Sequence, residues 1–148
     1  MPKPALRTVP ADAADYQLSD QVGFMLRQAS QRHVAIFAER IPDLTPTQFA
    51  ALARLCEVGA VSQNELGRRT SMDAATIKGV IDRLRKRGFV ASEPDPGDQR
   101  RILVSPTDAG RRTFAELAPA AEAISAETLA PLTAGERAQV LRLLAKLT

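Results

Sequence analysis

The sequence holds few of the residues that catalytic and metal-binding sites need. Its 148 residues include one cysteine, Cys56, one histidine, His33, and no tryptophan. One thiol and one imidazole leave little material for a zinc site or a nucleophilic triad. A glycine-rich phosphate-binding loop is absent as well. We therefore expect a protein that is not an enzyme and that binds no metal or organic cofactor.

Long apolar runs are missing too. No stretch approaches the roughly 20 apolar residues that span a bilayer, and the opening residues MPKPALRTVP lack the apolar segment of a secretory signal. The sequence therefore predicts a cytoplasmic protein with no membrane partner. The lone Cys56 cannot form an internal disulfide, which fits a reducing compartment. We expect its thiol to be buried and inert, and a redox role is the alternative.

The sequence has no large excess of charge of either sign. Twenty basic against 17 acidic residues leave a net charge of +3, which excludes a uniformly cationic coat for polyanions. The basic residues are unevenly placed, because residues 62–112 contain 11 Lys and Arg against 7 Asp and Glu. That third of the chain carries +4 and the remainder −1. The middle of the chain is therefore the part predicted to face a polyanion.

Helix signals dominate the chain, which is 45% hydrophobic and long enough to bury one core. Residues 1–14 hold three prolines and no apolar period, so they are predicted to form a loose arm. From Leu18 to Phe37 apolar residues recur at helical spacing. This predicts one long amphipathic helix within residues 15–41, ending before Pro42, whose apolar stripe needs a partner surface.

Five later helices are predicted from the residues that can cap their first turns. In four of them a hydroxyl residue is followed, three positions on, by a side chain able to reach back to it. These hydroxyl residues are Thr45, Ser62, Ser105 and Thr133. Asp73 can cap the remaining helix, and Gly88 is well placed to end it. The last helix carries an apolar stripe from Val140 to Leu147.

A β-hairpin is predicted directly after the helix that Asp73 caps. Residues 89–94 and 101–104 have the pattern of two short strands about a turn at residues 95–98. Helix, short helix, turn, helix and hairpin is the order of a winged helix-turn-helix, which we place in residues 45–112. The predicted fold class is therefore mainly α with a small β-hairpin wing, followed by helices in residues 113–148.

In such motifs the second helix of the turn lies in the DNA major groove, and its early residues reach base edges. The helix from Asp73 holds that place. On its outward side Thr76 and Lys78 are predicted near bases, and Arg83 and Lys86 near phosphates. The alternative is an ordinary solvated face, with basic residues favoured by the dipole at the helix end.

The turn of the hairpin carries a second basic group. Arg100 can enter a narrow minor groove, where the phosphate potential is strongest, and the Asp98 carboxylate can hold its guanidinium in place. A surface salt bridge within a turn is the alternative. The complete set of predicted DNA-contacting residues is Ser62, Gln63, Asp73, Ala75, Thr76, Lys78, Arg83, Lys86, Asp98, Arg100 and Arg101.

Two stretches resemble a known family. Residues 98–107, followed by Asp108-Ala109-Gly110, look like the wing signature of the MarR family, and residues 80–90 resemble the end of its recognition helix. The resemblance covers nearly the whole chain. Two positions depart from the family pattern: Ser105-Pro106 stands where leucine and threonine are common, and Gly79 where a longer polar residue is often found.

The resemblance implies a homodimer in which the helices of residues 15–41 and 113–148 intertwine. Such a dimer would bind an inverted repeat in double-stranded DNA, with half-sites on the order of 35 Å apart, and repression is the family's usual effect. Members commonly release DNA when a small ligand binds between the dimerisation helices and the winged domain. Residues 31–37 and 44–52 resemble members that control aromatic-acid catabolism, some of which respond to an aromatic coenzyme A thioester.

The resemblance also directs attention to candidate ligand-binding residues. His33, on the apolar side of its helix and expected to face Phe49 and Leu52, could pair with a ligand carboxylate or phenol, although a histidine satisfied within the core or the dimer interface is the alternative. The arginines of the same helix could meet a carboxylate or simply face water. The complete set is Arg27, Arg32, His33, Phe37, Arg40, Phe49 and Leu52.

Two other functions remain open from the sequence. A winged helix can serve as a protein-interaction module with an idle DNA face, but the pair Arg100 and Arg101 argues against that function. An architectural protein that binds DNA without specificity and without a ligand is the other alternative. The net charge of +3 argues against it, because non-specific affinity comes chiefly from phosphate neutralisation.

Overall fold

The computed structural model describes residues 15–148, so the predicted arm at residues 1–14 lies outside the described residues. The elements are η2 (Leu18–Asp20), α1 (Val22–Arg40), α2 (Pro46–Val58), β1 (Val61–Ser62), α3 (Gln63–Arg69), α4 (Ala74–Lys86), β2 (Val90–Asp95), β3 (Asp98–Pro106), α5 (Asp108–Thr128) and α6 (Ala134–Ala145). Their order is that of the predicted winged helix-turn-helix, flanked on both sides by helices.

Side-chain caps begin the helices from α2 onward. Thr45 and Thr133 form capping boxes with Gln48 and Glu136, as their spacing predicts. The Ser62 hydroxyl accepts a hydrogen bond from the backbone N–H of Glu65. Asp73 caps α4 by accepting from the N–H of Thr76 at 2.7 Å, and Gly88 follows the end of α4 with a φ of 75°. Four of the five predicted caps are therefore confirmed.

The predicted cap at Ser105 is wrong. Ser105 and Pro106 lie in β3, where they pair with Ala91 and Val90 of β2. The cap of α5 is Thr107, whose hydroxyl accepts from the N–H of Gly110 at 3.1 Å. The hairpin continues past the predicted end of its second strand, because the pairing with β2 uses the backbone of Ser105 and delays the helix.

The hairpin is part of a three-stranded sheet of order β1-β3-β2, whose short first strand was not predicted. Val61 pairs with Val104, and Ser62 with Leu103. A strand of two residues carries no alternating pattern to recognise, and Ser62 serves both as a strand residue and as the cap of α3. This pairing attaches the base of the wing to the start of the helix-turn-helix.

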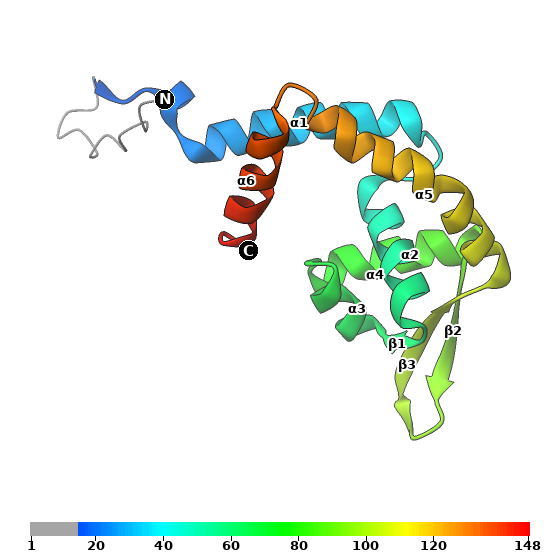
Figure 1. Ribbon diagram of the computed structural model, residues 1–148. Coiled ribbons are helices and arrows are strands. Elements are labelled where there is room, and N and C mark those ends of the chain that lie inside the picture. Colours follow the sequence, from blue (N-terminus) through cyan, green and yellow to red (C-terminus); the bar gives the residue numbers. More distant parts are fainter. Residues whose placement is uncertain (1–14) are drawn as a thin grey trace.

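One hydrophobic core joins the helix-turn-helix and the sheet to residues of α1 and α5. The apolar side of α4 supplies Ile77, Val80, Ile81 and Leu84, each at most 3% exposed. Leu52 and Leu55 of α2 pack into the same cluster. Figure 1 shows α1 and α5 side by side at one end of the molecule and the β2–β3 hairpin projecting at the other.

The winged unit is joined to α5 by a close backbone contact. The N–H of Thr107 donates to the carbonyl oxygen of Phe89, and the Thr107 hydroxyl donates to that of Gly88 at 2.6 Å. A Cβ on Gly110 would lie 2.1 Å from the Phe89 carbonyl oxygen. Glycine at position 110 is therefore required for the first turn of α5 to reach the end of the helix-turn-helix.

We predict that Gly110→Ala destabilises the fold by about 1–3 kcal/mol, because the added methyl overlaps backbone that cannot move aside like a flexible side chain. Thermal unfolding monitored by circular dichroism measures the effect as a lower Tm. Gly135→Ala is the matched control, since a Cβ there meets no atom within 4 Å and alanine favours the helix. Equal Tm values for the two variants would contradict this account of Gly110.

Candidate nucleic-acid interface and pocket

The helix α4 presents a polar face away from the core. Thr76, Lys78, Arg83 and Lys86 are exposed on it, as is Ala75, and Gly79 is half-buried. The turn before α4 contains Ser71 at a φ of 56°, a left-handed conformation that closes the angle between α3 and α4. The residues predicted near bases and phosphates therefore lie together on the outward side of the second helix of the motif.

An acidic residue lies among these cations. The Asp82 carboxylate accepts a hydrogen bond from Lys78 Nζ at 3.1 Å and another from the Arg85 guanidinium. These contacts hold the pKa of Asp82 below its usual range, and the hydrogen bond from Lys78 contributes most. The carboxyl group of Asp82 is therefore ionised at neutral pH. Arg85 also donates to the Ser92 hydroxyl of β2 at 2.9 Å. Neither Asp82 nor Arg85 was among the residues predicted from the sequence.

The predicted residues before α4 have structural contacts of their own. The side-chain oxygens of Ser62 and Asp73 act as helix caps, and the N–H of Thr76 keeps the pKa of Asp73 low. Gln63 is half-buried at the start of α3. Within α3, Glu65 of the first turn pairs with both Arg68 and Arg69, and those hydrogen bonds lower its pKa. The spacing of three and four residues from Glu65 is a pattern from which this cluster could have been predicted.

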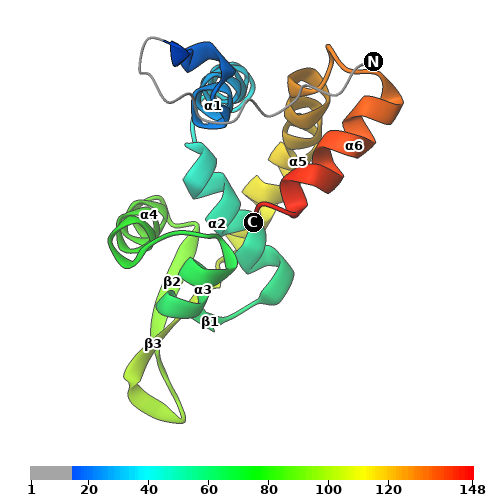
Figure 2. The same cartoon turned by 90° about the vertical axis from the view of Figure 1, so that its left-hand side faces the viewer.

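The wing places Asp98, Arg100 and Arg101 in exposed positions near its tip, which extends beyond the helices in Figure 2. The contact observed for Asp98 differs from the expected one. Its carboxylate accepts from the backbone N–H of Arg100 at 3.0 Å, and within residues 15–148 no ion pair joins it to the Arg100 guanidinium. A carboxylate two residues before an N–H closes a turn more readily than it reaches a long side chain.

Three polar candidate ligand residues of α1, Arg32, His33 and Arg40, contact the end of α5. Arg32 donates to the carbonyl oxygens of Thr128 and Glu127, the second at 3.0 Å. His33 Nδ1 lies 2.9 Å from Thr128 Oγ1, which is a contact other than the expected one with Phe49 and Leu52. Arg40 Nε lies 2.6 Å from the Glu127 carboxylate. Cations at a helix C-terminus are favoured by its dipole, so this group holds α1 against α5.

The apolar ligand candidates lie deeper in the molecule. The rings of Phe37 and Phe49 meet edge to face, with centroids 6.1 Å apart, and Phe49 also contacts Phe114 at 5.9 Å. Leu52 has no exposed surface. Arg27, by contrast, is exposed on α1. The structure therefore places six of the seven candidates in the contact between α1 and α5, in an aromatic cluster or in the core, and leaves Arg27 exposed.

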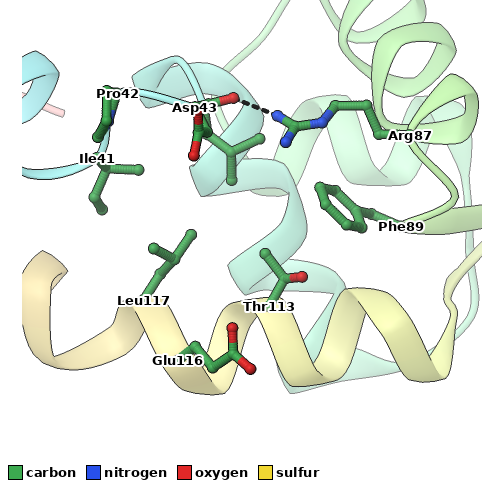
Figure 3. A pocket seen from close by; sticks show the side chains of 9 residues that line it. Ile41, Pro42, Asp43, Arg87, Phe89, Thr113, Glu116 and Leu117 are labelled. Carbon is green, nitrogen blue, oxygen red and sulfur yellow. Dashed lines mark hydrogen bonds between the residues drawn. The ribbon is translucent and has the colours of Figure 1, made fainter.

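A pocket of about 240 Å³ lies between the winged unit and α5, lined by residues that the sequence did not indicate (Figure 3). The Arg87 guanidinium donates to the backbone oxygen of Asp43 and stacks on the Phe89 ring, 4.8 Å from its centroid. Arg87 is also the C-cap residue of α4. The lining residues are Ile41, Pro42, Asp43, Leu44, Arg87, Phe89, Thr113, Glu116 and Leu117.

Residues 15–148 contain no cluster of His, Cys, Asp and Glu that could hold a metal ion. None of their helices is long and apolar enough to cross a membrane. Cys56 is half-buried, and burial raises the pKa of its thiol, so the reactive thiolate is a minor species at neutral pH.

The sequence and the fold of this chain are similar to those of known proteins. The MarR family model matches residues 44–102. The HTH-type transcriptional repressor NicR of Pseudomonas putida is 42% identical and aligns over 95% of this chain and 90% of its own length. The solved structure of a probable transcriptional regulator from Pseudomonas aeruginosa is 53% identical, covers 89% of this chain and 100% of that one, and has a TM-score of 0.87.

A second solved structure is that of Bordetella bronchiseptica BpsR, described in connection with the regulation of its DNA binding by 6-hydroxynicotinic acid. It is 43% identical, covers 89% of this chain and 96% of that chain, and has a TM-score of 0.86. The family model matches only residues 44–102, whereas these relatives align over both the winged unit and the flanking helices. The chain therefore belongs to the MarR family of transcriptional regulators, which are not enzymes.

Proposed function

We propose that this protein is a cytoplasmic homodimeric repressor that binds an inverted-repeat operator and is released from it by a small aromatic acid. The observation that carries the proposal is the exposure of polar and basic side chains on both α4 and the wing. Thr76 and Lys78 are exposed on α4, and Arg100 is exposed near the tip of the hairpin. A helix that enters the major groove and a basic wing that enters the minor groove together can bind one half-site of an operator.

The exposed apolar side chains support a dimer. In α1, Val22 is 64% exposed and Met25 52%. None of the residues of α6 is buried, Leu141 of this helix is 57% exposed, and Leu147, just beyond its end, is 70% exposed. A soluble monomer rarely leaves so many large apolar side chains in water on neighbouring helices. A second copy of the chain, related by a two-fold axis, would cover both stripes and set two α4 helices at a fixed separation.

The pocket beside Arg87 supports a single-ring acid as the effector. Its volume of about 240 Å³ suits one aromatic ring, whereas a coenzyme A thioester needs a site in or above the range of about 300–1,000 Å³ typical of drug-sized ligands. Ile41, Leu44 and Leu117 offer apolar contact, and Arg87 offers N–H donors to a carboxylate. The relative BpsR is described with 6-hydroxynicotinic acid, a molecule of this class. The residues around Arg32 and His33 are the second candidate location.

The pocket is placed where a ligand can act on DNA binding. Arg87 ends α4, and its guanidinium holds the carbonyl oxygen of Asp43 in the loop between α1 and α2. A ligand carboxylate that competes for this guanidinium would loosen the contact between the recognition helix and the dimerisation helices. Release of DNA then requires only that the ligand binds the loosened conformation more tightly than the DNA-binding one.

The proposal predicts tight binding to a duplex taken from upstream of the protein's own gene, and release by one member of a panel of aromatic acids. Fluorescence anisotropy at about physiological salt measures affinity for this duplex and for a random duplex of equal length, with and without each acid and its coenzyme A thioester. Equal affinity for both duplexes would favour an architectural protein, and no affinity for either would favour an interaction module. Operator binding that no compound alters would contradict the effector proposal alone.

Two variants locate the effector site. Arg87→Gln removes the guanidinium that holds Asp43, so it is expected to lower operator affinity in the absence of any acid. It should also raise the acid concentration that halves the remaining binding by tenfold or more, since a charge-assisted hydrogen bond contributes roughly 1.5–3 kcal/mol. His33→Gln is the control, with an unchanged response. If His33→Gln raised the acid concentration needed for release and Arg87→Gln did not, the effector would bind at the contact between α1 and α5.

A wing variant tests the DNA-binding surface. Arg100→Ala is expected to weaken operator binding at least tenfold, because a well-placed arginine contact contributes about 1–3 kcal/mol. The dimer should persist, as judged by light scattering. Lys146→Ala, which removes one positive charge from the end of α6, is the control and should alter affinity little. Equal effects of the two variants would show that only the total charge matters.

A further inference from the structure

The acidic side chain on the DNA-facing helix has a set of contacts that the proposed function does not explain. Asp82 lies one turn after Lys78 and one turn before Arg85, and its carboxylate accepts hydrogen bonds from both. Its side chain is 38% exposed and that of Lys78 is 67% exposed. A carboxylate therefore stands on the surface that would approach phosphates, and it holds one of the cations predicted to contact bases.

These contacts continue into the wing. Arg85 Nη1 donates to the Ser92 hydroxyl at 2.9 Å. Ser92 belongs to β2 and pairs with Val104 of β3, the strand that also carries Arg100. Lys78, Asp82, Arg85 and Ser92 thus form one continuous set of contacts from the outward face of α4 to the base of the wing. The two parts that would read the major and minor grooves are linked through Asp82.

Stability does not account for this arrangement. Exposed ion pairs contribute little to the free energy of unfolding, since water and salt screen them. A carboxylate at a DNA-facing position also lowers the affinity for every duplex, because affinity without specificity comes from phosphate neutralisation. What Asp82 does provide is order. Lys78 has fewer accessible rotamers when its ammonium is held, and a wing tied to α4 has fewer accessible angles.

We infer that Asp82 is a positioning residue that determines specificity: it orders Lys78 on α4 and, through Arg85 and Ser92, the wing, at the expense of affinity for DNA of any sequence. The inference rests on the proposed operator-binding function. A side chain with a fixed direction discriminates between base pairs, whereas a mobile ammonium binds any nearby phosphate or acceptor.

Asp82→Asn tests the inference through the ratio of operator affinity to random-duplex affinity. Affinity for the random duplex should rise, the ratio should fall about tenfold, which is the scale of one good base contact, and the Tm should stay unchanged. Glu93→Gln is the matched control, because it removes the same charge from β2, where no side-chain ion pair of Glu93 occurs within residues 15–148. An unchanged ratio in Asp82→Asn, or an equal fall in Glu93→Gln, would overturn the inference.

Ser92→Ala tests the link to the wing without a change of charge. The ratio should fall through weaker operator binding, while random-duplex affinity stays constant, and Ser92→Thr, which keeps the hydroxyl, should restore the ratio. An unaltered ratio in Ser92→Ala would overturn the part of the inference that concerns the wing. Failure of the proposed function is a separate result, since the unaltered protein would then show no preference for the operator.

Discussion

Burial of the apolar side of α4 is the constraint on which the rest of the structure depends. Ile77, Val80, Ile81 and Leu84 fill the centre of the core, and this burial fixes which side chains of the same helix face outward. Truncating any one of these four side chains to alanine would lower the free energy of unfolding by several times the contribution of an exposed ion pair. The direction of Lys78 and Arg83 is therefore a consequence of hydrophobic packing, to which electrostatics adds only local order.

The same core joins the DNA-facing surface to the helices that would form a dimer. Ile36 and Phe37 of α1 and Ile124 of α5 belong to the cluster that holds α4. Gly110 brings α5 against Phe89, and Arg87 reaches from the end of α4 to the loop before α2. A shift between the winged unit and α5 must therefore disturb contacts around the pocket. In the proposed dimer, this shared boundary would give a small ligand a physical route to the spacing of two recognition helices.

The sequence predicted what short-range chemistry determines. The caps at Thr45, Ser62, Asp73 and Thr133, the outward face of α4 and the exposed wing arginines all follow from patterns within a few residues. The turn at Asp98 and the ion pairs of Asp82 and Glu65 are local features that were missed. The other errors and omissions arise from contacts between distant segments. The pairing of β3 with β2 extended the strand through Ser105, and β1 forms only because Val61 meets Val104. The pocket needs three segments, around Asp43, Arg87 and Glu116, that no local pattern relates.

The central claim is that a dimer presents two α4 helices and two wings on one side of a DNA duplex. Hydroxyl-radical footprinting of the protein on DNA from upstream of its own gene tests this claim most directly. The account predicts two protected segments related by two-fold symmetry, with centres about 10–10.5 base pairs apart, and further protection in the flanking minor grooves where the wings lie. A single protected segment, or uniform protection along the duplex, would contradict it.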